Sequence, residues 1–332
     1  MQRPYNIFLQ LVIKLSIFIN IILSQNIPKS NPVHTYSIVA YDQDTGEFGV
    51  AVQSHWFSVG FLVPWAKAGV GAVATQSFVK VEYGPDGLIL MEEGKSAKEA
   101  LELLIAKDEG EDVRQVAMID SKGSVAAHTG KNCIYAAGHK VGKNYSVQAN
   151  LMEKESVWPA MAKAFEKTKG DLAERMMASL EAAEKEGGDI RGKQSAAMLI
   201  VTGEPTGIAW KDIVMDIRVD DNPEPLKELK RLIRIHKAYQ HANRGDHYLE
   251  IGKIDNALVE YDKASTLYPE NPELPYWSAV TLVSIGKLEK ALPIFSKVFK
   301  KQPMLKTMTP RLVDVGLLPD DKDVLEKIMK VN

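Results

Sequence analysis

The sequence contains very little cysteine: Cys133 is the only one in 332 residues. A single thiol excludes an internal disulfide and a metal cluster built from several cysteines of this chain. The chain also lacks a long basic run, and its 41 Lys and Arg and 43 Asp and Glu give a formal net charge of −2. Nucleic-acid binding usually requires a basic surface, so this composition argues against a nucleic-acid partner.

Long apolar runs are also scarce, apart from one near the N-terminus. Residues 15–23 form an apolar run that Arg3 and Lys14 precede. This run is too short to cross a bilayer and resembles the apolar core of a secretory signal. We therefore predict that residues 1–25 are a signal peptide and that the protein is exported, to the periplasm or outside the cell. An uncleaved anchor and a misassigned start codon are the alternatives. Residues 26–34, which include two prolines, read as a flexible lead-in.

A hairpin of two strands is predicted directly after this lead-in. Residues 35–41 and 47–54 alternate as strands do, and both faces are mostly apolar, so we expect both faces to be covered. Gly46 in the link between them suits a tight turn with positive φ. Residues 69–75 are small and apolar and predict a third strand. Thr35 is the first residue of the hairpin and lies at its open end.

The chain up to residue 222 mixes further strands with helices. A capping-box pattern begins at Ser96, and Asp171 followed by Glu174 marks the start of a helix. Residues 83–87 read as a turn that leads into a helix, and residues 55–65 as an aromatic loop or edge strand. The remaining expected strands are 113–120, 124–128, 145–150, 194–202 and 213–219, and the expected helices include 156–167 and 171–185. The pattern predicts an α+β layered domain that ends near 220–225.

From residue 223 to 332 only helices and a repeat are expected. Four residue pairs share an offset of 34 positions: Gly252 and Gly286, Ala257 and Ala291, Tyr261 and Phe295, Pro269 and Pro303. A period of 34, with Gly between two helices and Pro at the end, is typical of tetratricopeptide repeats. We predict an all-α tetratricopeptide-like domain with flanking helices at 226–235 and 324–329. Such repeats could dock a protein partner.

Thr35 is the principal candidate for chemistry. An N-terminal threonine can attack an amide carbonyl and use its own α-amine as the general base, because that amine titrates near neutrality. The reaction needs a rigid, accessible strand start, a nearby cation, and donors for the developing oxyanion. Lys67 is the candidate cation. The candidate donors and substrate-binding groups are Ser54, Gln76, Ser77 and Asn150. From the pattern alone, a threonine that opens a strand is more often a simple β-former.

Several segments resemble a family of uncharacterised bacterial and archaeal proteins. The matching segments are 35–42, 46–54, 63–76, 83–88, 138–139, 145–150, 187–195 and 216–223. The family carries a domain of unknown function that is placed in the N-terminal-nucleophile (Ntn) hydrolase-like class, and the resemblance extends over about residues 35–236. It implies a four-layer αββα sandwich and hydrolysis of amide or other C–N bonds by an N-terminal threonine. No activity is settled for the family.

The segment before Thr35 departs from the family pattern. Many relatives begin almost at this threonine, whereas a signal and a spacer precede it here. Signal cleavage near Ser24 leaves residues 25–34 in front of Thr35. The α-amine then becomes free only if autoproteolysis or another protease cuts between His34 and Thr35.

Other candidate residues lie at strand ends and in one loop. His55 and His128 each end a predicted strand, and either could reach the site or serve in packing. Asp189 and Arg191 lie in a loop that matches the family; they could grip a substrate carboxylate or form an ion pair that orders the loop. Residues 69–74 fit a dinucleotide-binding pattern, but no helix follows, so we expect no such site. We expect no metal and no cofactor.

The sequence therefore predicts an exported amidohydrolase of the N-terminal-nucleophile type. Thr35 is the expected nucleophile and base, Lys67 tunes the amine, and Ser54, Gln76 and Asn150 orient the substrate or the oxyanion. Small amides or short peptides are the expected substrates. Hydrolysis by other residues of the same cleft is one alternative, and a non-catalytic exported ligand-binding or scaffold protein is another. The sequence leaves a homo-oligomer open.

Overall fold

The structure is a computed structural model that describes residues 32–331. The predicted signal peptide, and the predicted lead-in as far as residue 31, lie outside the described residues. The chain divides after Leu229 into two compact units. The division falls inside helix α6 (Pro225–Glu250), a few residues beyond the boundary expected from the sequence.

The first unit is mixed α/β and contains two antiparallel sheets. The larger sheet has six strands in the order β11-β10-β3-β2-β9-β8. Its centre is the predicted hairpin, β2 (Thr35–Tyr41) and β3 (Phe48–Ser54), joined by a turn in which Gly46 has φ 79°. Both strands are buried almost throughout, as their apolar faces predict. The other strands are β8 (Gly138–Gly142), β9 (Tyr145–Ala149), β10 (Ser195–Val201) and β11 (Ile213–Val219).

The smaller sheet is built around β5 (Gly71–Phe78). Its order is β1-β5-β6-β7, and β4 (Pro64–Lys67) also pairs with β5. The remaining strands are β1 (Pro32–Val33), β6 (Arg114–Asp120) and β7 (Val125–Thr129). The prediction of a flexible lead-in is wrong at its last residues, because β1 pairs with β5 and Val33 and His34 are buried. Backbone pairing and burial of Val33 hold this segment in place.

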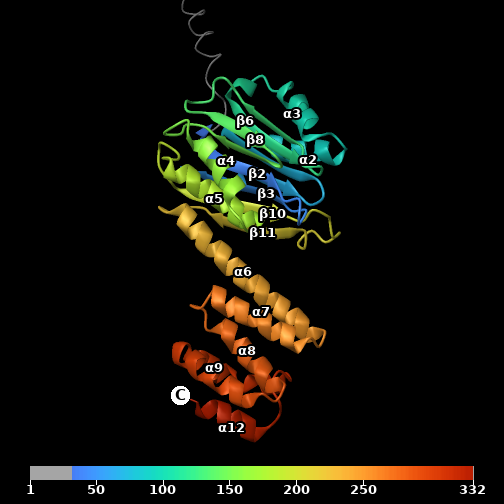
Figure 1. Cartoon of the computed structure of the whole chain (residues 1–332), viewed down its shortest axis with the longest axis vertical. Helices are drawn as coiled ribbons and strands as arrows, with labels where there is room; N and C mark the ends of the chain where they lie inside the picture. Colours follow the sequence, from blue (N-terminus) through green and yellow to red (C-terminus); the bar gives the residue numbers. More distant parts are fainter. Residues whose placement is uncertain (1–31, 332) are drawn as a thin grey trace, which may run out of the picture. The chain divides into compact units, whose positions relative to one another are not determined.

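Helices cover the outer face of each sheet (Figure 1). Helices α4 (Val157–Lys167) and α5 (Leu172–Lys185) pack on the larger sheet, and α2 (Tyr83–Glu92) and α3 (Ala97–Ile105) on the smaller one. Two short 3-10 helices, η1 (Val59–Phe61) and η2 (Glu111–Val113), lie in connections. The inner faces of the sheets meet in a core that includes Val39, Val50, Ala72 and Ala117.

Local sequence signals account for the starts of α3 and α5 in this unit. Ser96 with Glu99 forms the predicted capping box, and the predicted helix start at Asp171 is a capping box with Glu174. The expectation of a turn at residues 83–87 is wrong, because these residues are the first turn of α2. Pro85 is tolerated there because a backbone N–H in the first turn has no partner within the helix.

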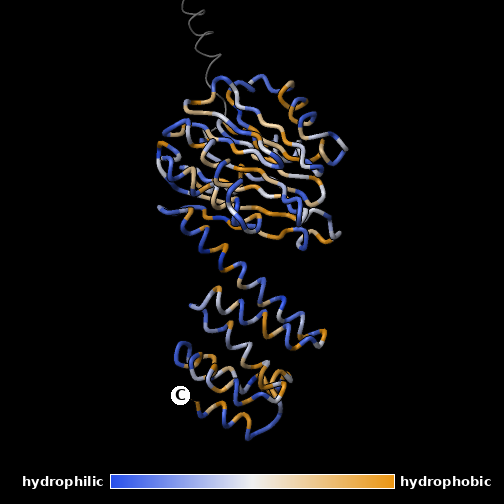
Figure 2. The backbone as a smooth tube through the Cα atoms, in the orientation of Figure 1, coloured by the Kyte–Doolittle hydropathy of each residue, from blue (hydrophilic) through white to orange (hydrophobic). Residues whose placement is uncertain are grey.

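The second unit is helical throughout its described residues. Its helices after α6 are α7 (Ile254–Leu267), α8 (Glu273–Ser284), α9 (Leu288–Lys301), α10 (Pro303–Met308), α11 (Arg311–Asp314) and α12 (Lys322–Lys330). Hydrophobic and hydrophilic residues alternate along each of these helices (Figure 2). Residues 34 positions apart share environments: Gly252 and Gly286 have φ 72° and 74°, and the side chains of Tyr261 and Phe295 are buried. None of the helices within residues 32–331 has the length and apolar character to cross a membrane.

Candidate functional site

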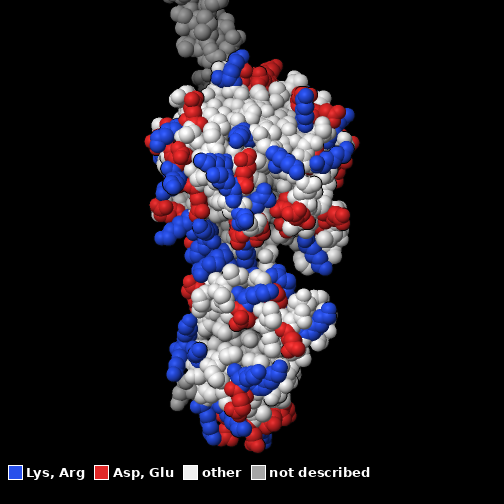
Figure 3. Space-filling model, in the orientation of Figure 1, with Lys and Arg blue, Asp and Glu red and all other residues white. Residues whose placement is uncertain are grey.

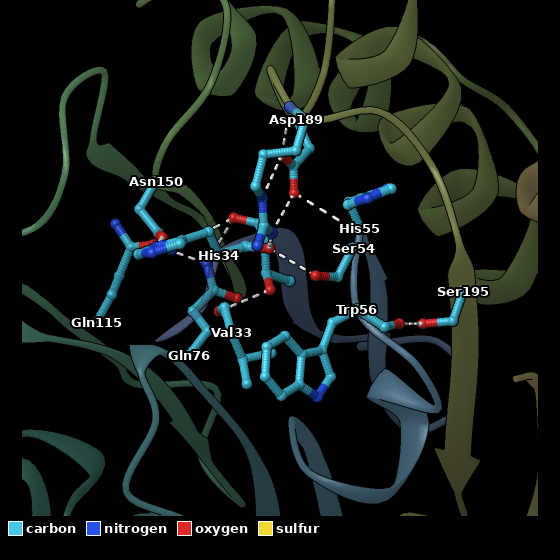
Figure 4. Close-up of polar contacts among 12 residues, drawn as sticks. Val33, His34, Ser54, His55, Trp56, Gln76, Gln115, Asn150, Asp189 and Ser195 are labelled. Atoms are coloured by element: carbon cyan, nitrogen blue, oxygen red, sulfur yellow. Dashed lines mark hydrogen bonds and ion pairs between the residues drawn. The ribbon is translucent and has the colours of Figure 1, made fainter. Parts of the chain in front are cut away.

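Polar side chains from both sheets meet around His34, directly before the start of β2 (Figure 4). Thr35 pairs with Ser54 on β3, and its carbonyl oxygen accepts hydrogen bonds from the backbone N–H of Asn150 (3.1 Å) and from Nε2 of Gln76 (3.1 Å). Asn150 follows the end of β9, and Gln76 lies on β5 of the other sheet. Three of the residues predicted from the sequence are thus brought to one point by three different strands.

The hydroxyl of Thr35 is completely enclosed in the intact chain. Thr35 has an exposed fraction of 0%, and its Oγ1 donates to the carbonyl oxygen of Val33 at 2.9 Å. The expectation that this strand start is accessible is therefore wrong for the chain with its preceding residues in place. Those residues, Val33 and His34, are themselves exposed by only 0% and 2%.

The carbonyl oxygen of His34, at the peptide bond before Thr35, has two side-chain donors. Ser54 donates through Oγ at 2.5 Å, and Arg191 donates through Nη2 at 2.8 Å. One of the two donors is positively charged. Fixed donors of this kind stabilise negative charge that develops on a carbonyl oxygen when its carbon is attacked. This peptide bond contains the amide nitrogen of Thr35, so its cleavage would free the Thr35 α-amine.

Asp189 fixes the position of the Arg191 guanidinium. The Asp189 side chain is buried, and its Oδ1 accepts from the backbone N and Nε of Arg191, both at 3.0 Å. Its Oδ2 accepts from Nη2 of Arg191 at 2.7 Å and from the backbone N of His55 at 3.2 Å. The structure shows the loop-ordering ion pair, and the same guanidinium aims Nη2 at the His34 carbonyl oxygen. Binding of a substrate carboxylate by this pair stays a prediction. His55 is an exposed residue and enters this network through its backbone.

His34 is a site residue that the sequence reading missed. Its Nδ1 lies 2.7 Å from Oδ1 of Asn150, and its ring meets that of Phe78 edge-on at 5.5 Å between centroids. Nδ2 of Asn150 donates to Gln115, so Oδ1 is the acceptor and His34 donates from Nδ1. Burial lowers the pKa of His34, against the raising effect of the hydrogen bond to Asn150. No sequence pattern marks this histidine beyond its place before Thr35.

Buried amides extend the site between the two sheets. Oε1 of Gln115 accepts from Nε2 of Gln76 (2.6 Å) and from Nδ2 of Asn150 (2.9 Å). Gln76 also accepts from Ser37 (2.5 Å), which in turn accepts from Gln148 (2.6 Å). The sequence did not predict Gln115 and Gln148 as site residues, because a single Gln within a strand matches no functional pattern. A polar layer between two sheets is stable only when its groups are paired, as these amides and Ser37 are.

Ser77 lies near the end of β5, and its buried hydroxyl makes no hydrogen bond to Thr35 or to another described residue. It pairs with Val33 in the register of β1 and β5. Its φ of 73° is unusual for a residue with a side chain, and such strain often accompanies functional sites. Ser77 is therefore placed to position the segment before Thr35.

Lys67 does not belong to this site, and the prediction that it tunes the amine is wrong. Lys67 pairs with Gly71 at the start of β5, whereas Gln76 and Ser77 lie near the opposite end of that strand. Its Nζ binds Glu92 at 2.6–2.7 Å, and about half of the side chain is exposed, at 49%. Arg191 is the cation that lies beside the His34 carbonyl oxygen, at 2.8 Å. The number of residues between Thr35 and Lys67 does not indicate which end of β5 lies next to the lysine.

The remaining candidates lie elsewhere. His128 contacts the carbonyl oxygen of Glu111 at 2.9 Å and its carboxylate at 3.1 Å.

Among the described residues, no group of three or more His, Cys, Asp or Glu side chains is placed to hold a metal ion. Basic and acidic side chains are interspersed on the face shown in Figure 3.

Comparisons with known proteins agree with the extent of the first unit. Residues 35–229 match a family described as a family of unknown function (DUF1028), and the match starts at Thr35 itself. The crystal structure of a DUF1028 protein from Silicibacter pomeroyi is similar to this chain, with 28% sequence identity and a TM-score of 0.56. The similarity covers 60% of this chain and 85% of that one. No curated protein matches the chain. Because the match spans more than half of its length, the chain belongs to the DUF1028 family.

Proposed function

We propose that the protein is an exported hydrolase of amide bonds of the N-terminal-nucleophile type, with Thr35 as the nucleophile. Small amides and short peptides are its proposed substrates. The observation that carries this proposal is the position of the His34 carbonyl oxygen, held by Ser54 and Arg191 next to the Thr35 residue. After removal of the residues before Thr35, the carbonyl of a substrate would take the same position.

The proposed reaction has two steps. Oγ1 of Thr35 forms a bond with the substrate carbonyl carbon while its proton passes to the free α-amine of Thr35. Ser54 and Arg191 stabilise the oxyanion, the C–N bond breaks, and the leaving amine takes the proton from the α-ammonium. Water then attacks the ester on Thr35 and releases the carboxylic acid, and Thr35 is restored.

The same geometry supports release of Thr35 by the chain itself. Attack of Oγ1 on the His34 carbonyl carbon would break the His34–Thr35 C–N bond, with the hydroxyl proton passing to the departing nitrogen. Water would then hydrolyse the resulting ester and leave a carboxylate on His34. The two donors on the His34 oxygen would stabilise this attack as well.

The charge of Arg191 fits the requirement for a neutral amine. A nearby positive charge disfavours protonation of an α-amine, which must be neutral to act as a base. Asp189 moderates this charge but also holds the guanidinium in place. Arg191 thus takes the role that the sequence assigned to Lys67.

The proposal includes an αββα sandwich, a tetratricopeptide-like second unit and export. Two facing sheets with helices on their outer faces are consistent with the αββα sandwich of Ntn hydrolases. The shared environments of residues 34 apart support a tetratricopeptide-like second unit that docks a protein partner. The predicted signal peptide at residues 1–25 supports export.

Two measurements test the hydrolase proposal. Mass spectrometry of the exported protein should find a chain that begins at Thr35. Turnover of an amide panel by that chain should persist in Thr35→Ser and vanish in Thr35→Ala. Unchanged turnover in Thr35→Ala would remove Thr35 from the mechanism.

A non-catalytic exported binding or scaffold protein is the second candidate. The complete enclosure of Thr35 in the intact chain favours it. An exported chain that begins near Gln25 and stays uncut, with no turnover, would support this alternative.

A further inference from the structure

The residues before Thr35 lie in the structure as a bound peptide does. Pro32 and Val33 add a short antiparallel strand to the edge of β5, opposite Phe78 and Ser77. Val33 is fully buried and belongs to the core cluster between the sheets, together with Val52. Extended peptides commonly bind proteins by adding a strand to a sheet edge, with alternate side chains in pockets.

The side chain of His34 has its own specific contacts. Its Nδ1–H donates to Oδ1 of Asn150 at 2.7 Å, its ring packs edge-on against Phe78, and only 2% of the residue is exposed. Asn150 is held in turn by a hydrogen bond from its Nδ2 to Gln115. The ring is therefore enclosed and has one fixed acceptor, Oδ1 of Asn150, beside it (Figure 4).

We propose that Val33 and His34 occupy the subsites for the acyl part of the substrate, so that the substrates are short extended peptides with histidine before the cleaved bond and a β-branched aliphatic residue before that. This inference rests on the proposed function, because it places the substrate carbonyl where the His34 carbonyl lies. The segment that ends in His34 is then also a product-like inhibitor of the site.

The chemistry of the pocket sets the selectivity. A side chain without a donor would leave the buried Oδ1 of Asn150 unpaired. The free-energy cost of an unpaired buried acceptor exceeds the net contribution of an ordinary hydrogen bond. Sites built to hydrogen-bond a substrate group reject analogues that lack it. A charged residue in place of Val33 would be placed in an apolar core cluster.

The test uses a chain that begins at Thr35, made by removal of an initiator methionine and carrying both units. The family match starts at residue 35, so this chain retains the whole matched region. Calorimetry measures binding of the peptide Lys-Ser-Asn-Pro-Val-His, which is residues 29–34 with a free carboxylate. Matched peptides replace His by Ala, His by Phe, or Val by Asp. A Thr35→Ala version of the same chain excludes turnover during the measurement.

We expect the Val-His peptide to bind at least about tenfold more tightly than each of the three control peptides. The His-to-Phe peptide retains the contact with Phe78 and isolates the hydrogen bond to Asn150. The full-length Thr35→Ala chain, which stays uncut, should bind none of the peptides, because its own segment fills the site. Equal affinity for all four peptides would overturn the inference. If the shortened chain does not fold alone, refolding with each peptide gives the same comparison through the yield of soluble protein.

Failure of the inference and failure of the proposed function give different results. Turnover of amides by the Thr35 chain without preference for Val-His peptides overturns the inference and leaves the hydrolase proposal intact. Selective binding of the Val-His peptide without turnover supports the peptide subsites and contradicts the hydrolase.

Discussion

The Nη2 atom of Arg191 lies 2.8 Å from the carbonyl oxygen of His34, the residue that immediately precedes Thr35. This contact joins a loop that follows α5 to the start of β2, 157 residues earlier in the chain. It places a positive charge at the one peptide bond whose cleavage would free the Thr35 amine.

Arg191→Lys should slow both the release of Thr35 and subsequent amide turnover by about 10²-fold. A lysine cannot reproduce the fork that binds Asp189 and the His34 oxygen together. The time course of the N-terminal mass measures the first effect. Lys67→Ala is the matched control, because Lys67 contacts Glu92 on the surface, and it should change neither rate. A large effect of Lys67→Ala with none from Arg191→Lys would reverse our assignment of the cation.

Ser54→Ala should reduce the same rates by about 10²-fold, since it removes one donor from the oxyanion position. Mass spectrometry and an amide panel provide the readouts. Ser58→Ala is the control: the Ser58 hydroxyl donates to Asp220 at an exposed site. Equal rates for Ser54→Ala and wild type would show that the 2.5 Å contact with His34 has no part in the chemistry.

Gln115→Leu should destabilise the protein by about 3 kcal/mol, because Gln76 and Asn150 would each lose a buried acceptor. Urea unfolding measures the change in the free energy of unfolding. The same replacement at the exposed Gln43 should change it by less than about 0.5 kcal/mol. Similar values for the two variants would mean that the interior amides contribute little.

His34 should make the stability of the uncut chain depend on pH. Burial holds its pKa below the ordinary value of 6.5. Because the folded pKa is the lower one, the stabilisation is complete above about pH 6.5 and is lost as the pH falls below that value. Urea unfolding at pH 7.5 and 5.0 should show a smaller difference for Thr35→Ala/His34→Gln than for Thr35→Ala. His139, whose pKa burial also lowers, contributes equally to both variants. An unchanged difference would contradict the burial of a neutral His34 ring.

Glu260 should protect the second unit at moderately acidic pH. Burial opposes its ionisation, but hydrogen bonds from Lys263, His241 and Arg244 outweigh it and lower its pKa to about 2. The stabilisation is therefore present above about pH 4.5 and is lost as the pH falls towards 2. Glu260→Gln should cost on the order of 1–2 kcal/mol at pH 7 and less than about half of that at pH 3, as urea unfolding would measure. Glu250→Gln, at an exposed site, should have little effect at either pH.

Local patterns predicted the elements well where one strand or helix carries its own signal. Residues 213–219 form a strand with the predicted bounds, and the capping residues Ser96 and Asp171 begin helices as expected. The short strand β8 was missed, and β4 overlaps only the end of the expected loop or edge strand at residues 55–65. Pairing with a neighbour stabilises such strands more than their own residues do.

The sequence by itself determined the buried hairpin, the polar residues at its open end and the change to helices after residue 222. Alternation, turn residues and a repeat are local properties, so they can be read along the chain. Only the tertiary structure decided that Arg191 and not Lys67 faces His34, and that the segment before Thr35 is a buried strand. Those outcomes depend on which ends of distant strands meet across two sheets, and chain separation carries no such information.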